Sequence, residues 1–150
     1  NYLDMTENNN KEFTEGNILW KNVATASSFN KKEQQVFNIN KNEILIAKVG
    51  DKFRAMQSRC PHAGLSMLGS QISSEKDLIF CKWHNTSFCY KDGKVDKWVD
   101  VPPYQKKLVK VLALFSKKLK QMVEMPATPI EIFKIQVIEK NVWVGIEVAN

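Results

Sequence analysis

The sequence predicts an all-β protein with an antiparallel core. Its apolar residues fall in short runs rich in Val, Ile, Phe and Trp, and turn-forming residues separate these runs. Gly50-Asp51 marks a tight turn, and Asp92-Gly93 between two runs is a strong hairpin signal. Because short strands joined by tight turns pair with their neighbours, we expect antiparallel sheets.

Taken in order, the chain starts with residues 1–16, which are rich in Asn and Glu and show no periodicity. We expect them to form a flexible tail. Runs of β-forming residues then predict strands at residues 18–23, 36–39, 43–49, 53–57, 78–80, 87–90, 95–99, 133–138 and 142–148. The stretch at 64–74 contains Gly and Ser and is expected to be loop, and Pro102-Pro103 ends a strand unit because proline cannot donate to a ladder.

Residues 107–123 depart from this pattern, because apolar side chains recur at helical spacing and lysines fall largely between them. The apolar positions are Leu108, Leu112, Phe115, Leu119 and Met122. We expect a basic amphipathic helix, closed off by Pro126 and Pro129. The predicted organisation is therefore a single domain at residues 17–150 with a helical insertion around 107–123.

Length and composition exclude several classes of function. The chain has 150 residues, 43% hydrophobic and 25% charged, which is ordinary for a globular domain. No run approaches the roughly 20 apolar residues that span a bilayer. The net charge is +6, but only Arg54 and Arg59 are arginines, which argues against nucleic-acid binding. Three cysteines exclude a disulfide framework and fit a reducing intracellular compartment, either cytoplasm or an organelle such as a plastid.

Both histidines and two of the three cysteines lie in one short window. One residue separates Cys60 from His62, and two residues separate Cys81 from His84. A zinc finger usually takes two Cys from one knuckle, whereas here each loop supplies one Cys and one His. This arrangement lets the cysteines hold one iron and the histidines the other, as in a Rieske-type [2Fe–2S] centre. Zinc in the same ligands, or Cys and His with structural roles alone, stay as alternatives.

The two loops, residues 60–65 (CPHAGL) and 81–88 (CKWHNTSF), resemble the paired cluster loops of Rieske-type ferredoxins and of oxygenase Rieske domains. The resemblance covers roughly residues 17–104 and 130–148, and the helix is additional to it. It implies a Rieske-type antiparallel β-sandwich with a small cluster-binding subdomain made of the two ligand loops. It also implies one [2Fe–2S] cluster per chain, with Cys60, His62, Cys81 and His84 as its metal ligands.

The resemblance further implies which residues surround the cluster: Gly64, Leu65, Trp83, Thr86, Phe88 and Pro102. High-potential Rieske proteins carry an extra cysteine at the positions of Leu65 and Trp83, which form a disulfide, and this chain cannot form one. They place hydroxyls at the positions of Thr86 and Phe88, and Phe88 cannot donate a hydrogen bond. We therefore expect a low reduction potential, on the order of −150 mV. We expect His62 and His84 at the exposed edge of the cluster.

The function implied is that of a ferredoxin-like one-electron carrier between a reductase and an acceptor such as an oxygenase, without catalytic residues of its own. An oxygenase needs a mononuclear iron with two further histidines, and none remain. Alternatives are a redox-sensing or structural subunit of a larger complex, including a plastid membrane-associated one, and a detached Rieske domain of an oxygenase system. We expect a monomer.

Two features stay open at this point. The basic helix either packs on the β core or docks on an anionic membrane or an acidic partner. Cys89 is expected to be a small buried hydrophobe rather than a redox thiol.

Overall fold

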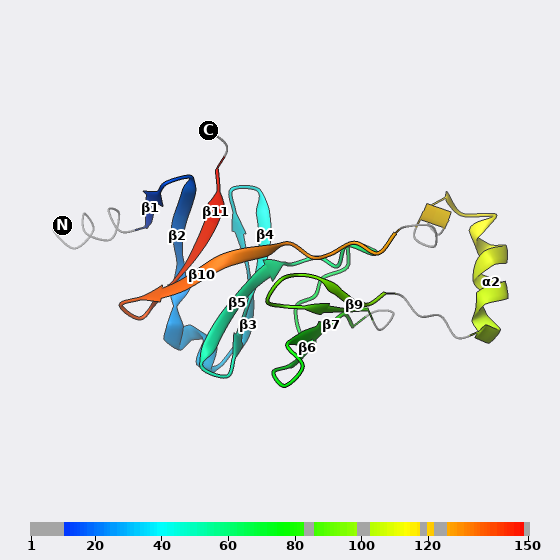
Figure 1. Ribbon diagram of the computed structural model, residues 1–150, viewed down its shortest axis with the longest axis horizontal. Helices are drawn as coiled ribbons and strands as arrows, with labels where there is room; N and C mark the ends of the chain where they lie inside the picture. Colours follow the sequence, from blue (N-terminus) through cyan, green and yellow to red (C-terminus); the bar gives the residue numbers. More distant parts are fainter. Residues whose placement is uncertain (1–10, 83–85, 99–102, 118–119, 122–125, 149–150) are drawn as a thin grey trace. The chain divides into compact units, whose positions relative to one another are not determined.

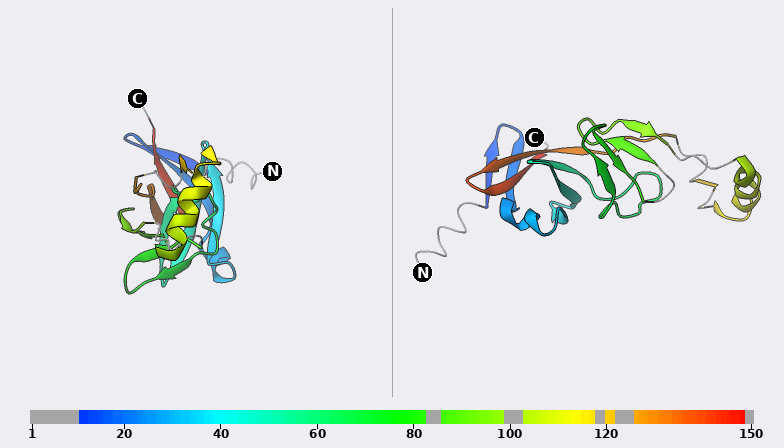
Figure 2. Two further views of the ribbon diagram at one scale, coloured as in Figure 1. Left: turned by 90° about the vertical axis from the view of Figure 1, so that its right-hand side faces the viewer. Right: turned by 90° about the horizontal axis from the view of Figure 1, so that it is seen from below.

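The structure is a computed structural model that describes residues 11–82, 86–98, 103–117, 120–121 and 126–148. The chain divides into two compact units, one formed by the chain up to Gln57 and from Glu131 onward, the other by Ser58–Ile130. Each unit has its own antiparallel sheet, whose strands can be followed in Figure 1 and from two further sides in Figure 2. Within the described residues, no helix is long and apolar enough to cross a membrane.

The first unit contains a seven-stranded sheet in the order β1-β2-β11-β10-β5-β4-β3. The strands are β1 Glu12–Glu15, β2 Ile18–Thr25, β3 Gln34–Ile39, β4 Asn42–Val49, β5 Lys52–Gln57, β10 Ile132–Ile138 and β11 Asn141–Glu147, and the 3-10 helix η1 spans Ala26–Asn30. β10 joins two groups of strands, because Ile132 and Phe133 pair with β5 whereas its later residues pair with β11. The sheet thereby forms the β-sandwich that the sequence predicts.

The core of this sandwich takes side chains from both groups of strands and from η1. Its buried members are Phe29, Ile39, Ile44, Ile46, Ala55, Phe133, Val142, Val144 and Ile146. Ile44 and Ile46 alternate along β4, as do Val142, Val144 and Ile146 along β11, so each strand presents one side to this core. The alternation of side chains along these strands thus places their apolar residues in the core.

Two tight turns fix the register of the sandwich strands. Asn40 and Lys41 have φ of 48° and 68°, and Glu139 and Lys140 repeat these values. Positive φ at both central residues is the type I′ hairpin geometry, whose twist matches that of the flanking strands.

The chain leaves this unit at Gln57 and returns at Glu131, and two hydrogen bonds join these residues. Gln57 N donates to Glu131 O at 2.9 Å, and Glu131 N donates to Gln57 Oε1 at 2.7 Å.

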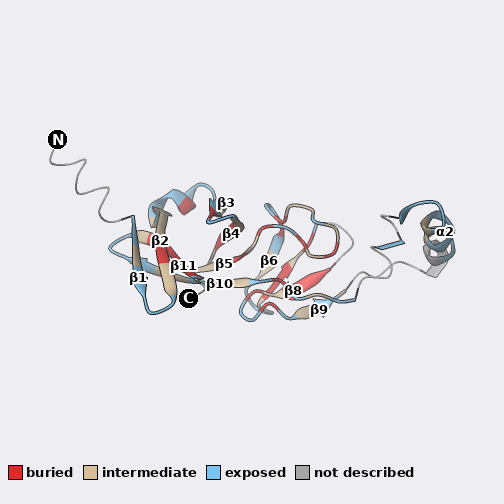
Figure 3. Cartoon of the chain, turned by 90° about the horizontal axis from the view of Figure 1, so that it is seen from above, coloured by how far each residue is buried: buried red, intermediate tan, exposed pale blue. Residues whose placement is uncertain are grey.

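The second unit contains a four-stranded sheet in the order β6-β7-β8-β9 and the helix α2. Its elements are β6 Gln71–Ser73, β7 Leu78–Phe80, β8 Ser87–Cys89, β9 Val95–Lys97 and α2 Pro103–Ala113. Ile79 and Phe88 face each other across β7 and β8, and both are fully buried, so β8 is largely buried in Figure 3. Ile130, the last residue of this unit, is tied to the β8–β9 turn, because its backbone N donates to Gly93 O at 3.0 Å.

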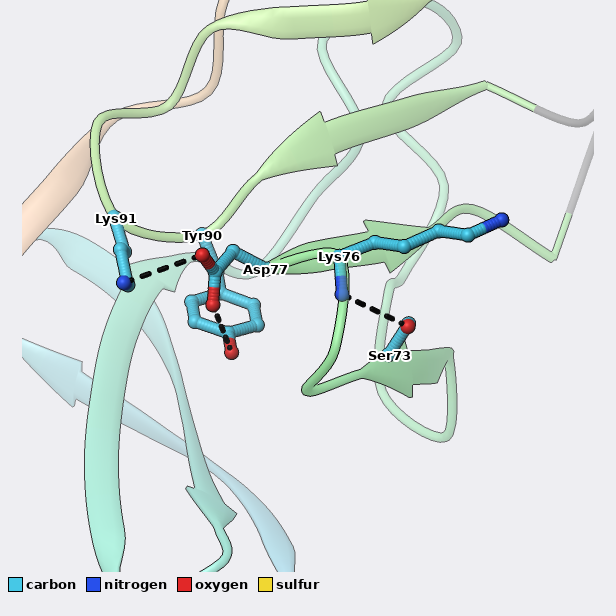
Figure 4. A network of polar contacts seen from close by, with 5 residues as sticks. All are labelled: Ser73, Lys76, Asp77, Tyr90 and Lys91. Atoms are coloured by element: carbon cyan, nitrogen blue, oxygen red, sulfur yellow. Dashed lines mark hydrogen bonds and ion pairs between the residues drawn. The ribbon is translucent and has the colours of Figure 1, made fainter.

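A polar network fixes the start of β7 against the end of β8 (Figure 4). Tyr90 Oη donates to Asp77 Oδ1 at 3.0 Å, Tyr90 N donates to Asp77 O at 3.0 Å, and Lys91 Nζ lies 3.2 Å from Asp77 Oδ2. The preceding turn is closed by Lys76 N, which donates to Ser73 Oγ at 3.3 Å. The strand that leads into Cys81 is therefore held at its far end by a buried tyrosine and its carboxylate partner.

The predicted strands are confirmed within a few residues, but three predictions need correction. Residues 12–15 of the expected tail form β1, because Phe13 stacks on Trp20 at 6.2 Å and packs against Trp143 at 5.2 Å between ring centroids. β6 lies in a stretch expected to be loop, because its backbone pairs with β7.

The third correction concerns the helix. α2 starts at Pro103, since proline suits the first turn, and it ends at Ala113; the chain turns at 114–116, and Lys117, Lys120 and Gln121 are helical again, so the helix predicted at 107–123 is interrupted. Its expected positions Leu119 and Met122 lie outside the described residues. The single domain at 17–150 stays a prediction.

Candidate metal centre

The first ligand loop is a hairpin closed by backbone hydrogen bonds. Met67 N donates to Ser58 O, Cys60 N donates to Leu65 O, and Gly64 N donates to Cys60 O, each at 2.8 Å. Gly64 has φ of 69°, a left-handed conformation that glycine adopts without strain. The loop therefore curls back on Cys60 at Gly64.

The second ligand loop lies between β7 and β8. Cys81 N donates to Thr86 O at 2.7 Å, directly after the pair formed by Phe80 and Ser87. The ladder thus continues to the base of the loop and places Cys81 at its first position. Trp83 and His84 lie outside the described residues.

Two cationic side chains hold these loops, and the sequence analysis did not single out either one for this role. Lys82 Nζ donates to Leu68 O at 2.6 Å, which ties the second loop to the end of the first. Arg59 Nη1 donates to Gly64 O at 3.0 Å and braces the turn of the first loop. Both contacts are charge-assisted hydrogen bonds, which are stronger than neutral ones.

The two loops bring Cys60 and Cys81 together in a buried position, and neither cysteine forms a disulfide. Their side chains hydrogen-bond to each other, and this contact together with burial raises the pKa of the Cys60 thiol far above its usual range. The backbone N–H groups of His62 and Ala63 act in the opposite direction, because they donate to the Cys60 sulfur and favour its thiolate. Iron binding requires thiolates, so loading of the site releases protons.

His62 does not lie at an exposed edge, which corrects the expectation from the sequence. The residue is only 7% exposed, and the indole of Trp98 packs edge-on against its imidazole, with ring centroids 5.4 Å apart and planes at 86°. Trp98 also meets the buried ring of Phe88 at 6.4 Å. Trp98 is thus a site residue that the sequence analysis missed. It follows β9 without any motif, and only the tertiary contact reveals it.

The remaining predicted neighbours are only partly visible. Leu65 is half-buried in the first loop, and Phe88 is fully buried in β8. Pro102 lies outside the described residues. Among the residues that the structure describes, no three His, Cys, Asp or Glu side chains form a group that could hold a metal ion.

Cys89 is half-buried rather than buried. Its thiol hydrogen-bonds to the carboxylate of Asp92. The pKa of Asp92 is lowered, mainly by the hydrogen bond from the backbone N–H of Lys94 and next by the hydrogen bond from this thiol. Cys89 therefore has a polar role in the β8–β9 turn that the sequence analysis did not predict.

Comparison with known proteins decides the family. The model of the Rieske [2Fe-2S] domain matches residues 19–134, which is most of the chain. The chain belongs to the Rieske [2Fe-2S] domain family. Its cofactor is accordingly a [2Fe–2S] cluster, as the sequence predicted.

A curated Rieske relative is the ferredoxin component of the alkene monooxygenase system of Xanthobacter autotrophicus. It is 29% identical over 62 residues, which are 41% of this chain and 50% of the relative, so the match spans half of the relative's length.

Solved structures show the same Rieske fold. The ferredoxin of carbazole 1,9a-dioxygenase from Nocardioides aromaticivorans IC177 has a TM-score of 0.59 and 17% identity, covering 83% of this chain and 95% of that one. A chain in a complex of reduced oxygenase and oxidized ferredoxin in carbazole 1,9a-dioxygenase has a TM-score of 0.59 and 20% identity, covering 87% and 96%. NdmA of Pseudomonas putida CBB5, solved with caffeine, has a TM-score of 0.56 and 16% identity, covering 83% and 32%. At these identities the likeness shows the fold alone.

The described residues fit a Rieske cluster. Besides the paired cysteines, Thr86 Oγ1 and Ser58 Oγ are buried without a hydrogen-bond partner in the described part of the chain. A buried hydroxyl without a hydrogen-bond partner destabilises the folded state, and a sulfur of the bound cluster would accept a hydrogen bond from it. We therefore propose Cys60 and Cys81 as ligands of one iron and His62 and His84 as ligands of the other, with Thr86 as a hydrogen-bond donor to the cluster.

We expect the substitution Cys81→Ser to abolish cluster binding, because a serine hydroxyl is a poor substitute for thiolate. The measurement is iron content together with visible absorption of the purified protein. The matched control is Cys89→Ser, which we expect to retain the iron content of the parent. A Cys81→Ser protein with full iron content would remove Cys81 from the ligand set.

We expect Thr86→Val to lower the midpoint potential, because the hydroxyl stabilises the reduced, more negative cluster more than the oxidised one. A hydrogen bond of about 1 kcal/mol corresponds to roughly 40 mV for one electron. Thr86→Ser keeps the donor and should stay near the parent value in the same redox titration. Equal midpoints for the Val variant and the parent, with intact clusters, would show that Thr86 donates elsewhere.

Proposed function

We propose that this chain is a one-electron carrier of the ferredoxin type, which takes an electron from a reductase and passes it to an acceptor such as an oxygenase. The observation that carries the proposal is the buried pair Cys60 and Cys81, which forms no disulfide and has backbone donors at Cys60, in a chain of the Rieske family. Two comparisons support it. One relative is named as the ferredoxin component of a monooxygenase system, and one solved structure is a complex of an oxygenase with a ferredoxin.

The chain's own residues have two tasks in this role. The bound cluster supplies reversible one-electron chemistry. Cys60 and Cys81 hold it in a buried position, which limits water at the sulfurs and favours the less charged oxidised state. The N–H groups of His62 and Ala63 act against this by stabilising negative charge at the Cys60 sulfur. No residue of this chain is proposed to transform a substrate, because both histidines are committed to the cluster.

The partners and location follow from the same role. We propose a reductase as donor, an oxygenase as acceptor and a monomeric carrier between them. None of the three cysteines forms a disulfide, which suits a reducing compartment. The organisms named for the relatives are bacteria, which supports the cytoplasm and gives no support to a plastid.

A detached Rieske domain of an oxygenase system is a second candidate, because the chain covers a third of NdmA at most. The two candidates differ in what the isolated protein does. A carrier accepts and donates electrons without consuming oxygen in the presence of substrate. A detached Rieske domain transfers electrons only to the catalytic partner with which it forms one oxygenase, and it does not reduce any other oxygenase.

An EPR-monitored redox titration tests the proposed carrier directly. We expect a Rieske-type signal in the reduced protein and a midpoint on the order of −150 mV at pH 7, because no inter-loop disulfide and no hydroxyl at position 88 stabilise the reduced cluster. A midpoint above about +100 mV would place the protein with the quinol-oxidising type instead.

Trp98 gives a second test of the site. We expect Trp98→Ala to expose His62 to water, which stabilises the reduced cluster and raises the midpoint by tens of millivolts, on the order expected for about 1 kcal/mol. Trp98→Phe keeps an aromatic cover and should remain close to the parent. If the Ala variant retains both its cluster and the parent's midpoint, Trp98 does not control water at His62.

A further inference from the structure

The helix α2 and the turn after it expose most of their apolar side chains. Leu108, Val111 and Leu112 are about half exposed or more, and Leu114 and Phe115 are 81% and 85% exposed. On the same helix, Val109 and Ala113 are half-buried. The side of α2 that carries its larger apolar residues is therefore the uncovered one. The sequence analysis left open whether this helix packs on the β core, and the exposed side chains favour the other reading.

The exposed apolar residues of α2 and the following turn are here named the α2 apolar surface: Leu108, Val111, Leu112, Leu114 and Phe115. Leu108, Val111 and Leu112 follow the spacing that places side chains on one side of a helix. The helix ends in a tightened turn, in which Leu114 N donates to Val111 O at 3.2 Å and Phe115 N donates to Leu112 O at 3.1 Å. These bonds keep the last two side chains next to the helical ones.

Lysines flank the α2 apolar surface along the chain. Residues 103–121 contain six lysines and neither Asp nor Glu. Lys107 and Lys110 on α2, and Lys117 and Lys120 after the turn, are exposed. The net charge of the whole chain is also +6, so this segment carries the charge excess of the protein. Any occupant of the surface must be apolar at the centre and anionic around it.

We propose that α2 and the following turn dock the chain on an anionic phospholipid surface. Acyl chains accept the apolar side chains, and lysines reach anionic headgroups over their long aliphatic stems. With 11 residues, α2 is about 17 Å long, roughly half of the hydrocarbon thickness, so it lies in the plane of the interface. A second copy is a poorer occupant, because two such segments would bring their lysines together.

This placement goes beyond electron carriage. A carrier held at a lipid surface searches in two dimensions and meets membrane-associated donors and acceptors more often than one in free solution. The redox properties of the two ligand loops are independent of it, so docking and electron transfer can fail separately. The midpoint titration described above reports on the cluster, and vesicle binding reports on α2.

The experiment is vesicle flotation with the full, cluster-loaded chain. The probes are vesicles of phosphatidylcholine alone and of phosphatidylcholine with phosphatidylserine, each at low and at high salt. We expect binding to the anionic vesicles, weaker binding at high salt, and little binding to the neutral ones. No binding to anionic vesicles, or equal binding to both kinds, overturns the proposal.

Paired variants separate the apolar from the electrostatic part. We expect Leu112→Gln with Phe115→Gln to abolish binding, and Lys107→Gln with Lys110→Gln to weaken it by roughly thirtyfold at low salt. The matched controls are Val137→Gln, an exposed apolar side chain in β10, and Lys31→Gln with Lys32→Gln, both exposed in the first unit. The controls should bind nearly as the parent does.

Cluster absorbance verifies that each variant is folded. Helix variants that bind as well as the parent overturn the proposal. The proposal is also overturned if the parent protein self-associates in light scattering, if Leu112→Gln with Phe115→Gln abolishes this self-association, and if the parent never binds vesicles. A second copy of the chain would then be the occupant.

Discussion

The structure depends on the meeting of the two ligand loops, so that Cys60 and Cys81 share one buried position. Each loop is closed at its base by a strand-like hydrogen bond: Cys60 N to Leu65 O and Cys81 N to Thr86 O. The β7–β8 ladder carries the second loop, and its far end is held by Tyr90 on Asp77. A shift of one residue in that ladder would turn Cys81 away from Cys60, because alternate residues of a strand face opposite sides.

Burial gives this site its chemical character. The cysteines, His62, Thr86 and Phe88 are all buried, so the charge change on reduction takes place where water helps little. Stabilisation of the reduced cluster must then come from fixed groups of the protein, such as the backbone N–H groups of His62 and Ala63. The same burial explains why Trp98 matters: it closes the side of His62 that the sequence suggested would face solvent.

Local patterns in the sequence predicted the strands and the ligand loops well. β4, β5, β10 and β11 follow runs of β-forming residues and tight turns, and the cluster loops carry a spacing with a specific chemical meaning. Several of the failures share one cause, which is that the stabilising contact comes from elsewhere in the chain. Phe13 sits among polar residues, and only its stacking on Trp20 makes β1 a strand, while Trp98 and Lys82 have no local signature of their roles.

The hydrogen bond from Lys82 to Leu68 has a consequence for how the site is assembled. In high-potential Rieske proteins a disulfide joins the two ligand loops, and it needs an oxidant to form. Here the link between the loops is non-covalent, so it forms without an oxidant and a cellular reductant does not cut it. The two loops are therefore joined without any change in the covalent structure of the chain, and the bond that joins them is compatible with the reduced thiols that iron binding requires.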